Sequence, residues 1–166
     1  MMLVKEAMTK TPVTCRTDTP LREVVALFRK HHIGGLPVLD GTELVGMVTE
    51  SDLISLLETE RTSDDLWLPS PFEVIEIPIR EYINWEKTRH SLQNIGDMPA
   101  KKIMTRRIIT AAENMDVEAA ASLMLREGIS RLPVLRGKII VGIITRADII
   151  NAIGSSYTQN TGTDQQ

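Results

Sequence analysis

The sequence predicts an α+β protein made of two copies of a β-α-β-β-α unit, related by a pseudo-twofold axis. Displacing the chain by 96 residues superimposes Lys5–Ile54 on Lys101–Ile150 without a gap. Of these 50 positions, 16 are identical, whereas chance matching at background composition gives about three. Within each copy, short aliphatic runs alternate with segments of helical periodicity, and this alternation predicts strands and helices in one unit.

Each copy is expected to begin with a short strand, at 12–15 in the first copy and at 108–110 in the second. Pro20 is expected in the first turn of the helix that follows, where its missing N–H costs nothing. Apolar residues then recur at helical spacing, so that each helix has one face for burial. These residues are Leu21, Val24, Val25 and Phe28 in the first copy and Val117, Ala120, Ala121 and Met124 in the second.

A hairpin and a closing helix complete each copy. Gly41 and Gly137 mark the hairpin turns, and the aliphatic strand after each turn is expected to be buried. The predicted hairpin strands span 36–39, 44–48, 132–135 and 140–144, and the closing helices span 51–57 and 147–153. One unit of about fifty residues is marginal alone, so we expect the two sheets to pack together with the helices outside.

The expected division of the chain is repeat 1 at 1–57, an insert at 58–98, repeat 2 at 99–154 and a disordered polar tail at 155–166. The insert contains both tryptophans. We predict one helix beginning near Ser70 and a second from 79 to 94 that is stopped by Gly96. The aromatic side chains of the insert pack either on the chain's own core or against a second copy or a partner.

Composition and the absence of known motifs exclude several classes of function. A hydrophobic content of 42% and a net charge of −3 are typical of a soluble globular protein, and give no reason to expect binding to nucleic acid or a membrane. Cys15 is the single cysteine, and no apolar run reaches the roughly 20 residues of a membrane span. We therefore expect a cytoplasmic protein. No catalytic motif or metal-ligand spacing is present, so we expect no enzyme activity.

A Thr-x-x-Asp motif stands between the last strand and the closing helix of each copy, as Thr49/Asp52 and Thr145/Asp148. By itself, this spacing predicts a helix capping box. Together with the repeated Met-Thr, Leu-Pro-Val-Leu and Val-Gly segments, it resembles the CBS-domain family. The resemblance covers residues 4–57 and 100–153. It indicates a tandem CBS pair, often called a Bateman module, of the stand-alone kind found in archaea and bacteria.

The resemblance implies that clefts between the two copies bind AMP, ADP, ATP or S-adenosylmethionine as regulatory ligands. An aspartate at a helix start can accept hydrogen bonds from ribose hydroxyls, and the nearby threonine and helix N–H groups suit a phosphate. The Thr49 cleft is expected to contain Thr49, Asp52, Ile109, Thr110 and Arg131. The Thr145 cleft is expected to contain Thr145, Asp148, Val13, Thr14 and Gly35. Because Gly35 stands where the other copy has Arg131, the Thr145 cleft is expected to rely on Arg146 for positive charge.

Two hypotheses of function follow from these observations. The first is a sensor of adenine nucleotides that acts as a homodimer or through an unknown effector protein. The second is a structural or interaction module whose clefts are vestigial and whose insert and helices serve oligomerisation. Binding of an adenine compound would distinguish the two.

Overall fold

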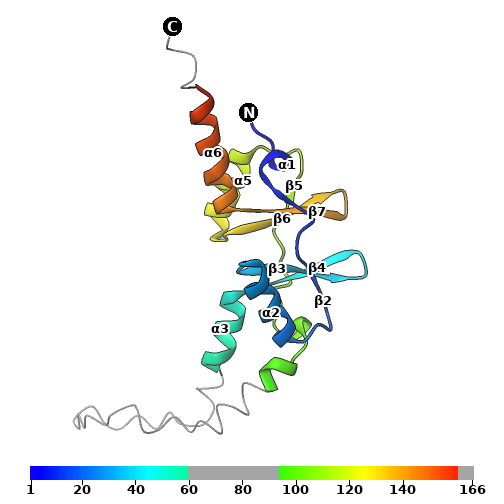
Figure 1. Ribbon diagram of the computed structural model, residues 1–166. Helices are drawn as coiled ribbons and strands as arrows, with labels where there is room; N and C mark the ends of the chain where they lie inside the picture. Colours follow the sequence, from blue (N-terminus) through cyan, green and yellow to red (C-terminus); the bar gives the residue numbers. More distant parts are fainter. Residues whose placement is uncertain (60–93, 161–166) are drawn as a thin grey trace, which may run out of the picture.

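The computed structural model describes residues 1–59 and 94–160. It contains two small sheets, one above the other, each with its own helices (Figure 1). Repeat 1 consists of β2 (Cys15–Arg16), α2 (Leu21–His31), β3 (Gly35–Asp40), β4 (Glu43–Thr49) and α3 (Glu50–Thr59). Repeat 2 consists of β5 (Ala111–Ala112), α5 (Val117–Glu127), β6 (Arg131–Arg136), β7 (Ile139–Thr145) and α6 (Arg146–Asn160). The predicted α+β class and the duplicated β-α-β-β-α order are confirmed.

The duplication extends to the irregular features of the sheets. In each repeat a short parallel strand is followed, after a helix, by an antiparallel hairpin. The hairpin register shifts between Val38 and Leu39, and at the equivalent position between Val134 and Leu135. Gly41 and Gly137 turn the hairpins with φ of 60° and 62°, a left-handed conformation that glycine adopts without a steric penalty. Equivalent residues of the two hairpins therefore have the same local backbone.

The segments that lead into the repeats are exchanged between them. The first arm (residues 3–10) contains α1 (Val4–Ala7) and β1 (Thr9–Lys10), and β1 pairs with β7 of repeat 2. The second arm (residues 99–106) contains the 3-10 helix η2 (Ala100–Lys102), and its Thr105 pairs with Met47 of repeat 1. The bridges Leu3–Asp116 and Pro20–Pro99 repeat this relation at the start of each arm. The exchange was not foreseen from the sequence.

Each arm completes the hydrophobic core of the opposite repeat. Val4 is fully buried in the core of repeat 2, beside Val117, Leu132 and Ile144. Ala100 and Met104 are buried in the core of repeat 1, which contains Leu21, Val24, Leu36 and Val48. Since each core takes apolar side chains from both halves of the chain, the two repeats form a single packing unit.

Several predicted boundaries are wrong. The short strands lie later than the predicted 12–15 and 108–110, because the chain first pairs with β3 at Cys15 and with β6 at Ala111. Pro20 is the N-cap of α2 and lies just before its first turn. The closing helices are longer than predicted, and α6 continues to Asn160, six residues into the predicted polar tail. A helix tolerates Gly154 because an interior glycine costs only about 1 kcal/mol.

The predicted insert falls mainly outside the described residues. Both tryptophans, the first predicted helix and all but the last residue of the second belong to residues 60–93, and the end of the predicted tail belongs to 161–166. Residues 94–97 are helical, so Gly96 lies within a helical turn and does not stop a helix as predicted. No helix in the described part of the chain has the length and apolar character needed to cross a membrane.

Candidate functional site

Both Thr-x-x-Asp motifs form helix capping boxes. Thr49 ends β4, and its backbone N–H and hydroxyl donate to Asp52 Oδ2 over 2.8 and 3.0 Å. The N–H of Asp52 donates back to the Thr49 hydroxyl over 3.4 Å. Thr145 and Asp148 repeat the arrangement with 2.8, 2.7 and 3.3 Å. The reciprocal bonds satisfy amide groups at the start of α3 and α6, so the structural reading of the motif is correct in both repeats.

The two aspartates differ in the hydrogen bonding of their second carboxylate oxygen, Oδ1. Oδ1 of Asp52 accepts a hydrogen bond of 3.3 Å from the hydroxyl of Thr105, in the second arm. Among the described residues, none donates a hydrogen bond to Oδ1 of Asp148. A carboxylate has about four acceptor positions in all. Each aspartate therefore caps its helix and still has acceptor capacity for a ligand.

The Thr49 cleft is a real cavity of about 430 Å³ lined by both repeats. Repeat 1 contributes Gly34, Met47, Thr49, Glu50 and Ser51. The second arm and repeat 2 contribute Thr105, Arg107, Ile108, Ile109, Gly128, Ile129, Ser130, Arg131, Pro133 and Arg146. The structure thus places Thr49, Ile109 and Arg131 around one cleft, while Asp52 and Thr110 are not among its lining residues.

Arg131 crosses from repeat 2 to the glycines of repeat 1. A Cβ on Gly35 would lie 2.6 Å from Arg131 Nη1, and one on Gly34 would lie 2.9 Å from Glu50 Oε2. Burial lowers the pKa of the half-buried Arg131, and the nearby Glu50 carboxylate opposes that shift. Arginine nevertheless stays protonated at neutral pH. Gly35 is therefore more than the uncharged counterpart of Arg131, because its missing side chain makes room for the guanidinium.

Arg146 lies elsewhere than expected. It was assigned to the Thr145 cleft, but it lines the Thr49 cleft. Its Nε and Nη2 donate to the carbonyl oxygen of Ile129 over 3.1 and 2.9 Å. These bonds hold the first side chain of α6 against the chain just before β6, on the side that faces repeat 1. Both Arg131 and Arg146 therefore line one cleft.

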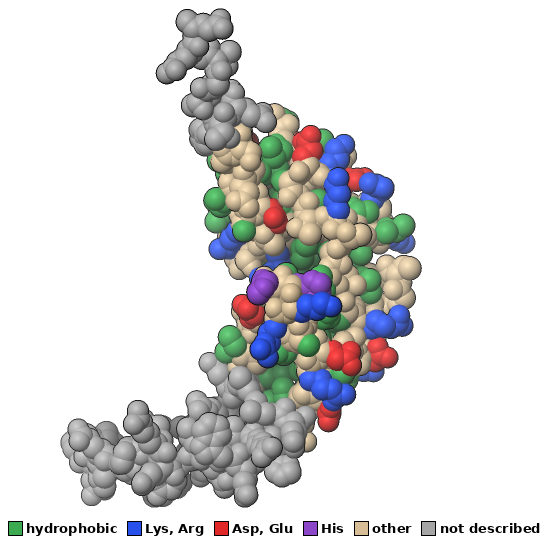
Figure 2. Space-filling view, viewed as in Figure 1, with side chains coloured by type: hydrophobic (Ala, Val, Ile, Leu, Met, Phe, Trp, Pro, Cys, Tyr) green, Lys and Arg blue, Asp and Glu red, His purple; other side chains and the backbone are tan. Residues whose placement is uncertain are grey.

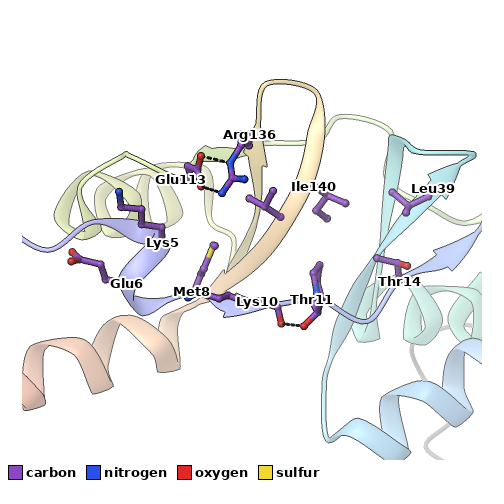
Figure 3. A pocket seen from close by; sticks show the side chains of 12 residues that line it. Lys5, Glu6, Met8, Lys10, Thr11, Thr14, Leu39, Glu113, Arg136 and Ile140 are labelled. Atoms are coloured by element: carbon purple, nitrogen blue, oxygen red, sulfur yellow. Dashed lines mark hydrogen bonds and ion pairs between the residues drawn. The ribbon is translucent and has the colours of Figure 1, made fainter.

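The remaining predicted residues do not gather in this cleft. Thr145, Asp148, Val13 and Gly35 line none of the cavities described here. Thr14 lines a separate pocket of about 790 Å³ beside the first arm (Figure 3). Figure 3 also shows Arg136 and Glu113 paired at one side of this pocket, with N···O distances of 2.5 and 2.7 Å. Their pairing lowers the pKa of Glu113 and cancels the charge of both groups at that wall.

Sequence reasoning missed Arg107, Ile108 and Ser130 as lining residues. Arg107 is brought to the cleft by the second arm, whose crossing to repeat 1 has no signature in the sequence. The available signal was the difference between the copies, since the first copy has Thr11 at the position of Arg107. No group of three His, Cys, Asp or Glu side chains in the described part of the chain is placed to hold a metal ion.

Comparison with known proteins identifies the family to which this chain belongs. The sequence model of the CBS-domain family matches residues 4–59 and 100–155. An uncharacterised protein of Methanocaldococcus jannaschii, MJ1426, is 38% identical over 156 residues, which are 92% of each chain. The CBS domain-containing protein YhcV of Bacillus subtilis is 26% identical and is matched over 90% of this chain and 84% of its own length.

A solved structure extends the likeness to three dimensions. The CBS domain pair of protein MJ0100, in complex with 5′-methylthioadenosine and S-adenosyl-L-methionine, is 26% identical with a TM-score of 0.68. The match covers 94% of this chain and 98% of that chain. The fold and the matched segments define a tandem pair of CBS domains. The chain belongs to the CBS-domain family.

Proposed function

We propose that the protein is a regulatory module that binds an adenine-containing ligand between its two repeats and has no catalytic activity of its own. The observation that carries the proposal is the Thr49 cleft. Residues of both repeats line it, and Asp52, which bonds to Thr49 in the capping box, follows the lining residue Ser51 in the chain. The related CBS pair of MJ0100, which binds two adenosine compounds, supports the choice of ligand. A ligand held by both repeats favours the arrangement of the repeats that it binds more tightly.

The lining residues suggest a role for each part of the ligand. Ile108 and Ile109 offer an apolar wall for adenine. Asp52 has one acceptor position left on Oδ1 for a ribose hydroxyl, and Arg131 offers N–H donors to a phosphate. By the family resemblance, Asp148 is proposed as the ribose acceptor of a second site, with Thr145, Val13, Thr14 and Gly35 as its neighbours.

The signal is proposed to leave the protein through a homodimer or an effector protein in the cytoplasm. Exposed apolar side chains on four helices are the proposed contacts of this partner surface. They are Val25 on α2, Ile54 on α3, Leu125 on α5, and Ile150 and Ile153 on α6. The same residues are what the rival hypothesis, an interaction module with vestigial clefts, requires.

Calorimetry with AMP, ATP and S-adenosylmethionine tests the proposal. We expect heat of binding for at least one compound, and we expect Asp52→Asn and Asp148→Asn each to remove one binding event. Asparagine keeps an oxygen for the capping bonds but removes the charge that ribose hydroxyls favour, so the folded state is retained. Circular dichroism checks the fold of each variant.

Two results would contradict the proposal. Absence of heat for all three compounds with folded wild-type protein would favour the interaction module. Unchanged stoichiometry in both variants would show that the aspartates are capping residues only.

A further inference from the structure

The Thr49 cleft has a local excess of positive charge. Arg107, Arg131 and Arg146 line it, and Glu50 is its single acidic lining residue among the residues described. Three guanidinium groups and one carboxylate give a formal charge of +2, opposite in sign to the −3 of the whole chain. On the face drawn in Figure 2, basic and acidic side chains are interspersed over both repeats. The excess therefore belongs to the cleft and is not part of a basic surface on that face.

The three guanidinium groups keep most of their donors available. Arg146 bonds to a single carbonyl oxygen, and Arg131 bonds to the hydroxyl of Ser130 over 3.3 and 3.4 Å. Arg107 Nη2 lies 3.6 Å from a carboxylate oxygen of Glu127, too far for a strong hydrogen bond. Arg136, in contrast, makes two hydrogen bonds to the carboxylate of Glu113, which neutralises its charge. A guanidinium has five N–H donors arranged to match phosphate oxygens, so the cleft presents unused phosphate-binding capacity.

Arg107 distinguishes this cleft from its counterpart. It follows directly after the second arm and precedes Ile108 and Ile109, the apolar wall proposed for adenine. The equivalent residue of the first copy is Thr11, which has no charge. The side chain of Arg107 is 85% exposed, so it can move toward a ligand without disturbing the core.

We infer that the Thr49 cleft takes a phosphorylated nucleoside in preference to a sulfonium or thioether derivative of adenosine, and that Arg107 is a phosphate-binding residue that sets this preference. The inference rests on the proposed function, because it assumes an adenosine compound in the cleft. Phosphate gains charge-assisted hydrogen bonds from the arginines. S-adenosylmethionine has a sulfonium and an ammonium against one carboxylate, so the same groups repel its net positive charge. The uncharged 5′-methylthioadenosine gains no charge-assisted hydrogen bond from them.

The test is calorimetry with ADP, AMP, 5′-methylthioadenosine and S-adenosylmethionine, in an Asp148→Asn background that leaves the Thr49 cleft intact. We expect ADP and AMP to bind more tightly than the two sulfur compounds. Arg107→Gln is expected to weaken ADP binding about tenfold, the usual size of one hydrogen bond to a charged group, and to leave 5′-methylthioadenosine binding unchanged. It should also reduce the salt dependence of ADP binding.

The matched control is Arg126→Gln. Arg126 pairs with the same Glu127 over 3.1 Å, but it does not line the cleft, so the control is expected to bind ADP like the parent. Equal affinity for ADP and S-adenosylmethionine, or an equal loss of ADP binding in both variants, would overturn the inference while the proposed function stands. Binding of none of the four compounds would overturn both.

Discussion

The two repeats have nearly the same backbone but different side chains where they meet. The capping boxes, hairpin turns and register shifts coincide residue for residue. The side chains at the junction do not, since Gly35 faces Arg131, and Glu50 of α3 corresponds to Arg146 of α6. Both arginines line the Thr49 cleft. Duplication thus conserves the scaffold, while a few substitutions near the pseudo-twofold axis concentrate charge on one side.

The largest expected effect on stability comes from truncating the same core side chain in each repeat by mutation to alanine. Leu36 and Leu132 are equivalent and fully buried, so Leu36→Ala and Leu132→Ala are each expected to lower the free energy of unfolding by about 3 kcal/mol. Because the exchanged arms join the two cores, both variants should unfold in one transition, followed by circular dichroism in urea. Two separate transitions would show that the repeats are independent units.

An intermediate effect is expected at the helix faces. Ile54 and Ile150 are equivalent and 58% and 66% exposed. If these faces meet in a homodimer, Ile54→Glu or Ile150→Glu should weaken association by about 2 kcal/mol, roughly thirtyfold in Kd. Sedimentation equilibrium measures the change. Ile139→Glu, at an equally exposed site near a hairpin turn, is the control. A monomeric wild type, or an equal effect of the control, would rule out this dimer.

A third comparison concerns Cys15, whose counterpart in repeat 2 is Ala111. Burial raises the pKa of the Cys15 thiol from about 9 to about 11. A raised pKa in the folded state stabilises the fold at pH values below the ordinary one, and this stabilisation is lost as the pH rises toward the folded value. Between pH 9 and 11, wild-type protein should therefore lose stability that Cys15→Ala retains, as measured by urea unfolding. Parallel pH profiles would contradict the assignment.

The elements of the fold could be predicted because their signals are local. Aliphatic runs such as 36–39 and the turn at Gly41 lie within one repeat, and the displacement of 96 residues aligned them twice. The exchanged arms could not be predicted, because Val4 and Met104 pack against residues far away in the chain. Within the site, Thr49, Ile109 and Arg131 followed from the family resemblance. Arg146 was placed in the wrong cleft because the direction of a long surface side chain depends on contacts such as Ile129 O.

The exchanged arms also constrain the order in which the chain can fold during synthesis. The core of repeat 1 lacks Ala100 and Met104 until the second arm has left the ribosome. Val4 is made long before its partners and packs against them only when Met115 and Val117 have been made, since its N–H bonds to the carbonyl of Met115. Contacts over such long sequence separations slow folding, because the loop must close before they form. Neither repeat can therefore complete its core until the arm that it receives and the repeat itself have both been made.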